Sequence, residues 1–147
     1  MNFLAIDSTG HFSSVGIFEI INKKLILKDS NFNFLIKNNN KPIDKLISQT
    51  IHTNQIANLE FIVVSLGPGS FTKIRSSLAF AKGLSCGLKV PIIGVNGFQK
   101  LFEVGKGLNK KNTSLLIACD TFRKSAFVSF QNFKNKSFDN KIEIFSV

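Results

Sequence analysis

Two short polar segments hold the residues with which this sequence could bind a phosphate. The first is the turn Asp7, Ser8 and Thr9, which lies between two apolar runs that predict strands. A carboxylate and two hydroxyls at such a turn can face a phosphate group or its metal ion. They can equally well bond their own backbone in a polar hairpin. The tetrapeptide that ends at Gly10 leaves both interpretations open.

The second segment is the glycine loop, which consists of Gly67, Pro68, Gly69, Ser70, Phe71 and Thr72. It follows a predicted buried strand and precedes a predicted helix. Glycine permits positive φ and close backbone approach, and Ser70 or Thr72 can cap the helix. The free amides and the helix dipole favour an anion there by ~0.3–1 kcal/mol. The Gly-Lys-Ser/Thr ending of a P-loop is absent, so a tight turn with a helix cap also explains the loop.

Residues that could carry catalysis are sparse. His11 and His52 are isolated, and no paired metal spacing exists. No Gly-x-Ser-x-Gly elbow is present. Asp7, Glu60 and Asp120 are the only acids near the ends of predicted buried strands, which is too few for a two-metal nuclease. We therefore expect no catalytic residue and no metal site.

The helix predicted at Thr72–Gly87 has many small side chains around its apolar face. Glycine inside a helix costs ~1 kcal/mol relative to alanine, so Gly83 requires a compensating reason. The close approach of another helix, from this chain or from a second protein, would supply one.

The elements that must position these segments follow the order β-β-β-α-β-α-β-α, a meander and then two crossovers. This order predicts an α/β fold with a mixed five-stranded sheet covered by helices, as in ribonuclease-H-like folds. The predicted strands are Asn2–Asp7, Phe12–Ile20, Leu25–Ile36, Phe61–Leu66 and Pro91–Val95, and the predicted helices are Pro42–Thr53, Thr72–Gly87 and Phe98–Val104.

A second unit follows a polar linker predicted at Gly105–Thr113. An apolar strand that ends in Asp120 and its return strand at Ser125–Gln131 repeat the pattern of the first strand pair, and Ile142–Phe145 is strand-like. We predict a lobe at 1–105 and a partial, strand-rich second lobe at 106–147, an arrangement typical of duplicated actin-like folds. Three strands without a covering helix should be weakly stable.

Composition sets outer limits. The 147 residues fit one domain or two small lobes, and no apolar run reaches the ~18 residues of a membrane span. The start does not resemble a signal peptide, and Cys86 and Cys119 are expected to be reduced core residues, so we expect a cytoplasmic protein. The net charge of +10 comes mainly from lysine. It indicates either polyanion binding or a compositional bias.

Three stretches resemble the TsaB (YeaZ-like) family of bacterial tRNA threonylcarbamoyladenosine biosynthesis proteins. Phe3–Thr9 with Ser13–Ile17 is similar to the family's opening strand, turn and return strand. Gly67–Arg75 is similar to its Gly-Pro-Gly-Ser-Phe-Thr-Gly-x-Arg signature, and Ala81–Leu84 with Val90–Val95 resembles the helix end and strand that follow.

The resemblance implies an actin-like ATPase fold and a non-catalytic subunit that pairs with TsaD. It also implies that TsaE joins the complex, that the complex acts on tRNAs reading ANN codons, and that ATP and threonylcarbamoyl-adenylate are used by the partners rather than by this chain. The resemblance leaves open whether the chain forms a homodimer without TsaD. Pairing would use the helix after the glycine loop and the helix before it. The implied pairing residues are Arg75, Ser76, Ala79, Phe80 and Gly83.

The sequence departs from the family pattern at several positions. Lys73 replaces the signature glycine, and Ser76-Ser77 replaces Ile-Gly. In the second lobe, Asp120–Phe127 has lost the family's glutamate and displaced its arginine. Two other functions therefore stay open. One is an actin-like phosphotransferase that uses Asp7 and the glycine loop, and the other is a stand-alone RNA-binding module that uses the lysine-rich end.

Overall fold

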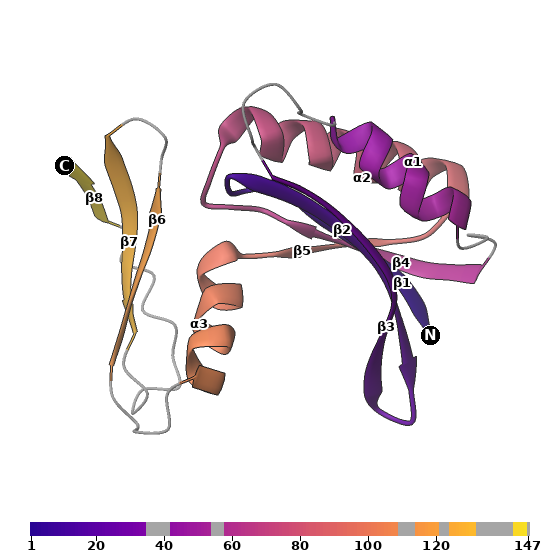
Figure 1. Cartoon of the computed structure of the whole chain (residues 1–147), viewed down its shortest axis with the longest axis horizontal. Coiled ribbons are helices and arrows are strands. Elements are labelled where there is room, and N and C mark those ends of the chain that lie inside the picture. Colours follow the sequence, from indigo (N-terminus) through magenta and orange to yellow (C-terminus); the bar gives the residue numbers. More distant parts are fainter. Residues whose placement is uncertain (35–41, 54–57, 109–113, 121–123, 132–142, 147) are drawn as a thin grey trace.

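The computed structural model of the chain describes residues 1–34, 42–53, 58–108, 114–120, 124–131 and 143–146 (Figure 1). Residues 109–113, which belong to the predicted linker, lie outside the described residues. Residues 121–123, where the sequence departs from the family pattern, lie outside them as well. The elements are β1 (Asn2–Asp7), β2 (Phe12–Ile21), β3 (Lys24–Phe34), α1 (Ile43–Thr53), β4 (Leu59–Ser65), α2 (Phe71–Leu88), β5 (Ile92–Val95), α3 (Gly97–Leu108), β6 (Leu115–Asp120), β7 (Ser125–Gln131) and β8 (Glu143–Ser146).

The predicted mixed five-stranded sheet is confirmed. Its strand order is β3-β2-β1-β4-β5. Strands β1, β2 and β3 form an antiparallel meander, whereas β4 pairs parallel to both β1 and β5. The two crossovers run through α1 and α2 because parallel neighbours need a long connection. The carboxyl ends of β1 and β4 therefore meet at one edge of the sheet, and the Asp7 turn and the glycine loop leave from that edge.

Helices α1 and α2 lie side by side over one face of this sheet (Figure 1). Strand alternation directs Leu4 and Ile6 of β1, and Ile62 and Val64 of β4, into the layer below the helices, where each is at most 2% exposed. Leu46 of α1 completes this core. Burying one such side chain contributes about 1.5–3 kcal/mol, so this layer is the main source of stability.

The opposite face of the sheet is aromatic at one end and hollow at the other. The Phe3 ring stacks on Phe18 and Phe61, with centroid separations of 5.2 and 4.7 Å. Beside the stack lies a hollow of about 390 Å³. It contains the Ser65 hydroxyl, which is buried without a hydrogen-bond partner among the described residues.

Strands β6, β7 and β8 form a second, antiparallel sheet, and α3 lies between the two sheets (Figure 1). Two predictions about this region were wrong. Helix α3 continues to Leu108 rather than ending at Val104, so the linker cannot begin at Gly105. The second sheet also has a helix against it, because Gly105 lies so close that an added Cβ would be 2.6 Å from Leu115 Cδ1. Leu116, on the other face, is 68% exposed.

Two further outcomes concern composition. Cys86 is exposed and Cys119 is half-buried, so the prediction of two core cysteines was wrong. None of the helices in the described part of the chain is both long and apolar enough to span a membrane.

The core assignment makes a stability prediction. Ile62→Ala removes a fully buried side chain of β4 and should lower the free energy of unfolding by about 2–5 kcal/mol, because the cavity cannot close. Ile93→Ala on β5 makes the same change at a side chain that is 47% exposed and should cost about 1 kcal/mol or less. Urea denaturation of both variants measures the difference. Equal losses would contradict the assignment.

Candidate functional site

The Asp7 turn is held together by its own side chains. Asp7 Oδ1 accepts hydrogen bonds from the Thr9 amide at 3.0 Å and from Thr9 Oγ1 at 2.8 Å. The Ser8 hydroxyl donates to the carbonyl of Lys73 in α2 at 2.9 Å. Ser8 and Thr9 are buried. These contacts match the polar-hairpin interpretation for Asp7 and Thr9, whereas Ser8 bonds another element instead of its own backbone.

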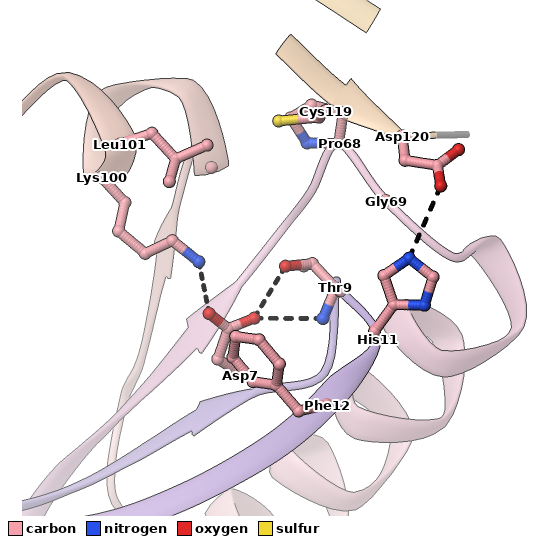
Figure 2. Close-up of a pocket in the computed structure, with 12 residues that line it drawn as sticks. Asp7, Thr9, His11, Phe12, Pro68, Gly69, Lys100, Leu101, Cys119 and Asp120 are labelled. Atoms are coloured by element: carbon pink, nitrogen blue, oxygen red, sulfur yellow. Dashed lines mark hydrogen bonds and ion pairs between the residues drawn. The ribbon is translucent and has the colours of Figure 1, made fainter. Parts of the chain in front are cut away.

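Lys100 of α3 pairs with the second oxygen of Asp7 (Figure 2). Burial acts to raise the pKa of the Asp7 carboxyl. The hydrogen bonds from Lys100 and Thr9, with the Lys100 charge, outweigh that effect and hold the pKa below its ordinary value. Asp7 is therefore a carboxylate whose two oxygens are both engaged within the chain.

The glycine loop fits between the Asp7 turn and the start of α3. The Ser70 amide donates to the Thr9 carbonyl at 2.9 Å, and the Gly97 amide donates to the Gly67 carbonyl at 2.5 Å. A Cβ on Gly69 would lie 2.1 Å from the Thr9 carbonyl oxygen, and one on Gly97 would lie 2.6 Å from that of Gly67. The glycines thus allow three backbone segments to touch, as the sequence predicted for this loop.

The predicted side-chain cap of α2 is absent. Ser70 occupies the N-cap position, but its side chain makes no capping hydrogen bond, and Thr72 lies inside the helix. The Ser70 carbonyl accepts the Ile74 amide at 2.9 Å. The start of α2 is fixed by the backbone bond from Ser70 to Thr9 instead.

Lys73, which replaces the signature glycine, contributes a contact of its own. Its ammonium donates to the Gly10 carbonyl at 3.0 Å. Burial lowers the pKa of Lys73. The Lys73 carbonyl also accepts the hydrogen bond from the Ser8 hydroxyl. Lys73 therefore connects the first turn of α2 to the Asp7 turn through both its backbone and its side chain.

A cavity of about 230 Å³ lies between the two sheets (Figure 2). Asp7 and Lys100 line it from one side and Asp120 from the other. Asp120 Oδ2 pairs with His11 Nε2 at 3.5 Å, and both side chains are more than half exposed. Within the described ranges, no group of three or more His, Cys, Asp or Glu residues is placed to hold a metal ion.

The outer face of α2 is open. Phe71 is 72% exposed and Phe80 is 41% exposed, and nothing lies within 4 Å of a Cβ built on Gly83. Arg75, Ser76 and Ala79 are also exposed. The side of α2 that packs on the sheet is instead formed by Ser77 and Ala81, with partly buried residues beside them. None of the described residues of this chain covers the predicted pairing face.

Comparison with known proteins identifies the family. The family model described as "TsaD: tRNA N6-adenosine threonylcarbamoyltransferase" matches residues 35–143. Two curated TsaB proteins of Buchnera aphidicola are each 33% identical to this chain, over 86 residues in the strain from Acyrthosiphon pisum and over 115 in that from Schizaphis graminum. These alignments cover 58% and 77% of this chain, and 37% and 52% of the relatives. The chain belongs to the TsaB/YeaZ family.

The Escherichia coli TsaB is 27% identical over 124 residues, which are 82% of this chain and 50% of that protein. The chain therefore spans about half the length of the curated relatives it matches, or less. Each of these relatives is named a tRNA threonylcarbamoyladenosine biosynthesis protein.

Solved structures confirm the actin-like, ribonuclease-H-like fold class. YeaZ from Pseudomonas aeruginosa aligns with a TM-score of 0.68 at 14% identity, over 99% of this chain and 64% of that one. An exopolyphosphatase from Cytophaga hutchinsonii aligns with a TM-score of 0.52 at 11% identity, over 100% of this chain and 51% of that one.

Sequence reasoning found the Asp7 turn, the glycine loop and the open helix face, but it missed the residues that join them. Lys100 gave no signal, because it is one of many lysines and its partner is far away in sequence. Lys73 stood out only because it replaces the signature glycine, which did not indicate its contact with Gly10. Gly97 was equally hidden. Its position two residues after the end of a predicted strand was the one available sign of a close approach.

Gly69→Ala tests the contact between the loop and the Asp7 turn. The new Cβ meets a backbone oxygen that cannot move freely, so we expect a loss of about 1–3 kcal/mol in the free energy of unfolding. Gly10→Ala is the matched control in the neighbouring turn, where nothing lies within 4 Å of a Cβ. Thermal unfolding of both variants measures the difference. A Gly69→Ala protein as stable as the wild type would contradict the close packing.

Asp7→Asn tests the pair with Lys100. Because the folded protein holds the Asp7 pKa below its unfolded value, the pair adds stability above about pH 4, and this is lost as the pH falls through the folded pKa. We expect wild type to exceed Asp7→Asn by about 1 kcal/mol at neutral pH, since both side chains are about a third exposed. The difference should vanish in acid. Lys100→Gln should flatten the profile in the same way, and a gap that is constant with pH would argue against the pair.

Proposed function

We propose that this chain is a non-catalytic subunit in the biosynthesis of threonylcarbamoyladenosine in tRNA, and that it pairs with TsaD through α1 and α2. Membership of the TsaB/YeaZ family supports the pathway. The open face of α2 carries the pairing role. TsaE would join the complex, ATP and threonylcarbamoyl-adenylate would be handled by the partners, tRNA would be reached through the complex, and the site of action would be the cytoplasm.

The geometry of the Asp7 turn favours this role over a phosphotransferase. Both carboxylate oxygens of Asp7 are engaged, by Thr9 and by Lys100, so a metal-bound phosphate would have to compete with these two residues for the carboxylate. The polar groups of the Asp7 turn instead connect this turn to α2 and α3.

The pairing face has the properties that helix-to-helix docking requires. Ala79 and Gly83 are small and exposed, and they are four residues apart, so they lie on the same face of α2. A partner helix can therefore approach closely there. Phe80, beside them, offers an apolar anchor, and aromatic residues are enriched among the residues that dominate binding energy.

Gly83→Trp tests pairing against a matched control. The indole would stand in open space in the isolated chain, so folding should be retained, but it would occupy the approach path of a partner helix. We expect co-purification with TsaD to fall at least about tenfold and threonylcarbamoyladenosine, measured by mass spectrometry of tRNA, to fall with it. Gly107→Trp makes the same change at an open position of α3 and should leave both unchanged.

Two results would overturn the proposal. One is a wild-type chain that does not co-purify with TsaD from its own organism. The other is a Gly83→Trp chain that supports normal tRNA modification in a strain without another source of the subunit.

A further inference from the structure

We propose that the open face of α2 selects a partner helix with carboxylates along one edge and disfavours a second copy of this chain. The inference rests on the proposed function, because it names the charge of the surface that the pairing face would meet. It is carried by the placement of cations on α2.

Helix α2 has no acidic residue along its whole length, Phe71–Leu88. Arg75 and Lys82 are both exposed and are seven residues apart, which is about two turns and ~10 Å along the axis. They therefore form a row on one side of the small residues Ala79 and Gly83. Lys89, which follows the helix at its C-cap, is exposed as well.

The cations of this row differ from Lys73, whose ammonium is taken up by the Gly10 carbonyl. Arg75 lies over the ring of Phe71, with its guanidinium carbon 5.3 Å from the centroid. This contact leaves the guanidinium charge uncompensated, since an aromatic ring carries no net charge. Arg75 can therefore still pair with a carboxylate that arrives on another protein.

Helix α1 does not cancel the charge of the row. Its charged side chains are Asp44 and Lys45, which have opposite signs, and its exposed His52 is the other titratable group on the helix. The excess positive charge of the α1–α2 face therefore comes from Arg75, Lys82 and the C-cap residue Lys89.

Self-pairing would double this charge. In a two-fold interface each subunit presents the same patch, so every cation of α2 appears twice while α2 supplies no carboxylate to separate them. Like charges brought together at an interface are unfavourable, and opposite charges select a partner. A partner helix with Asp or Glu along the matching edge would neutralise the row.

The two kinds of pairing must respond to salt in opposite directions. Salt shortens the Debye length from ~10 Å at 0.1 M to ~3 Å at 1 M. Screening removes repulsion between copies of this chain but weakens attraction to an acidic partner. From about 0.05 M to about 0.5 M sodium chloride, we expect self-association to strengthen roughly threefold or more and binding to TsaD to weaken by a similar factor. Sedimentation equilibrium of the chain, alone and with TsaD, measures both.

Charge reversal separates the row from the net charge of +10. At low salt, Arg75→Glu/Lys82→Glu mixed with wild type should associate more tightly than either protein alone, and the double variant should bind TsaD more weakly. Lys23→Glu/Lys24→Glu, at the turn between β2 and β3, makes the same charge change away from the face. It should not promote association with wild type.

Three results would overturn the inference. They are self-association that weakens with salt, equal effects of the two double variants, and no association in any mixture of copies. Failure to bind TsaD at either salt concentration would instead overturn the proposed function. The experiments on copies of the chain alone would still decide whether the cationic row opposes self-pairing.

Discussion

The contact between the Thr9 carbonyl and the glycine loop is the constraint on which the arrangement depends. Gly69 passes this oxygen at a distance that no side chain would allow, and Ser70 donates its amide to it. The contact fixes where α2 begins relative to the end of β1. Because the Gly67 carbonyl accepts the Gly97 amide, it also fixes where α3 begins. One crowded point thus sets the direction of the open helix and the position of the helix that packs on the second sheet.

The same point explains why polar residues typical of a phosphate site can serve a structural role. A buried carboxylate is costly unless it is paired and hydrogen-bonded. Lys100 and Thr9 meet that requirement for Asp7, and the Lys73 carbonyl does so for the Ser8 hydroxyl. Each bond joins a different element to the turn. A ligand that claimed Asp7 would have to displace Lys100, which would loosen α3 from the first sheet.

The sequence was sufficient to predict the centre of the first sheet because β1 and β4 are apolar runs bounded by polar or glycine-rich turns, and a continuous apolar run is typical of a central strand. Gly83 indicated the close approach of another helix but left open whether that helix belongs to this chain, and the family resemblance favoured a second protein. Other features depend on contacts between distant residues. Lys100 and Asp7 are 93 positions apart, and nothing local distinguishes Lys100 from the other lysines.

The capping prediction failed because a backbone bond to Thr9 replaced the side-chain bond that local reasoning assigns to Ser70. The predicted end of α3 is too early because Gly105 begins a polar stretch that predicts a linker, whereas it is the position at which Leu115 packs against the helix.

Packing and charge on α2 constrain its partner in different ways. Small residues such as Gly83 set how closely another helix can approach. They do not distinguish a copy of this chain from a different protein, because any helix with small side chains at the contact can pack there. Charge does distinguish them, because Arg75 and Lys82 repel their own duplicates and attract carboxylates. Gly83 costs the free chain ~1 kcal/mol relative to alanine, and this cost is recovered only when a partner fills the open face. A face that is costly when empty and repulsive towards its own copy fits a subunit whose stable state is a complex with another protein.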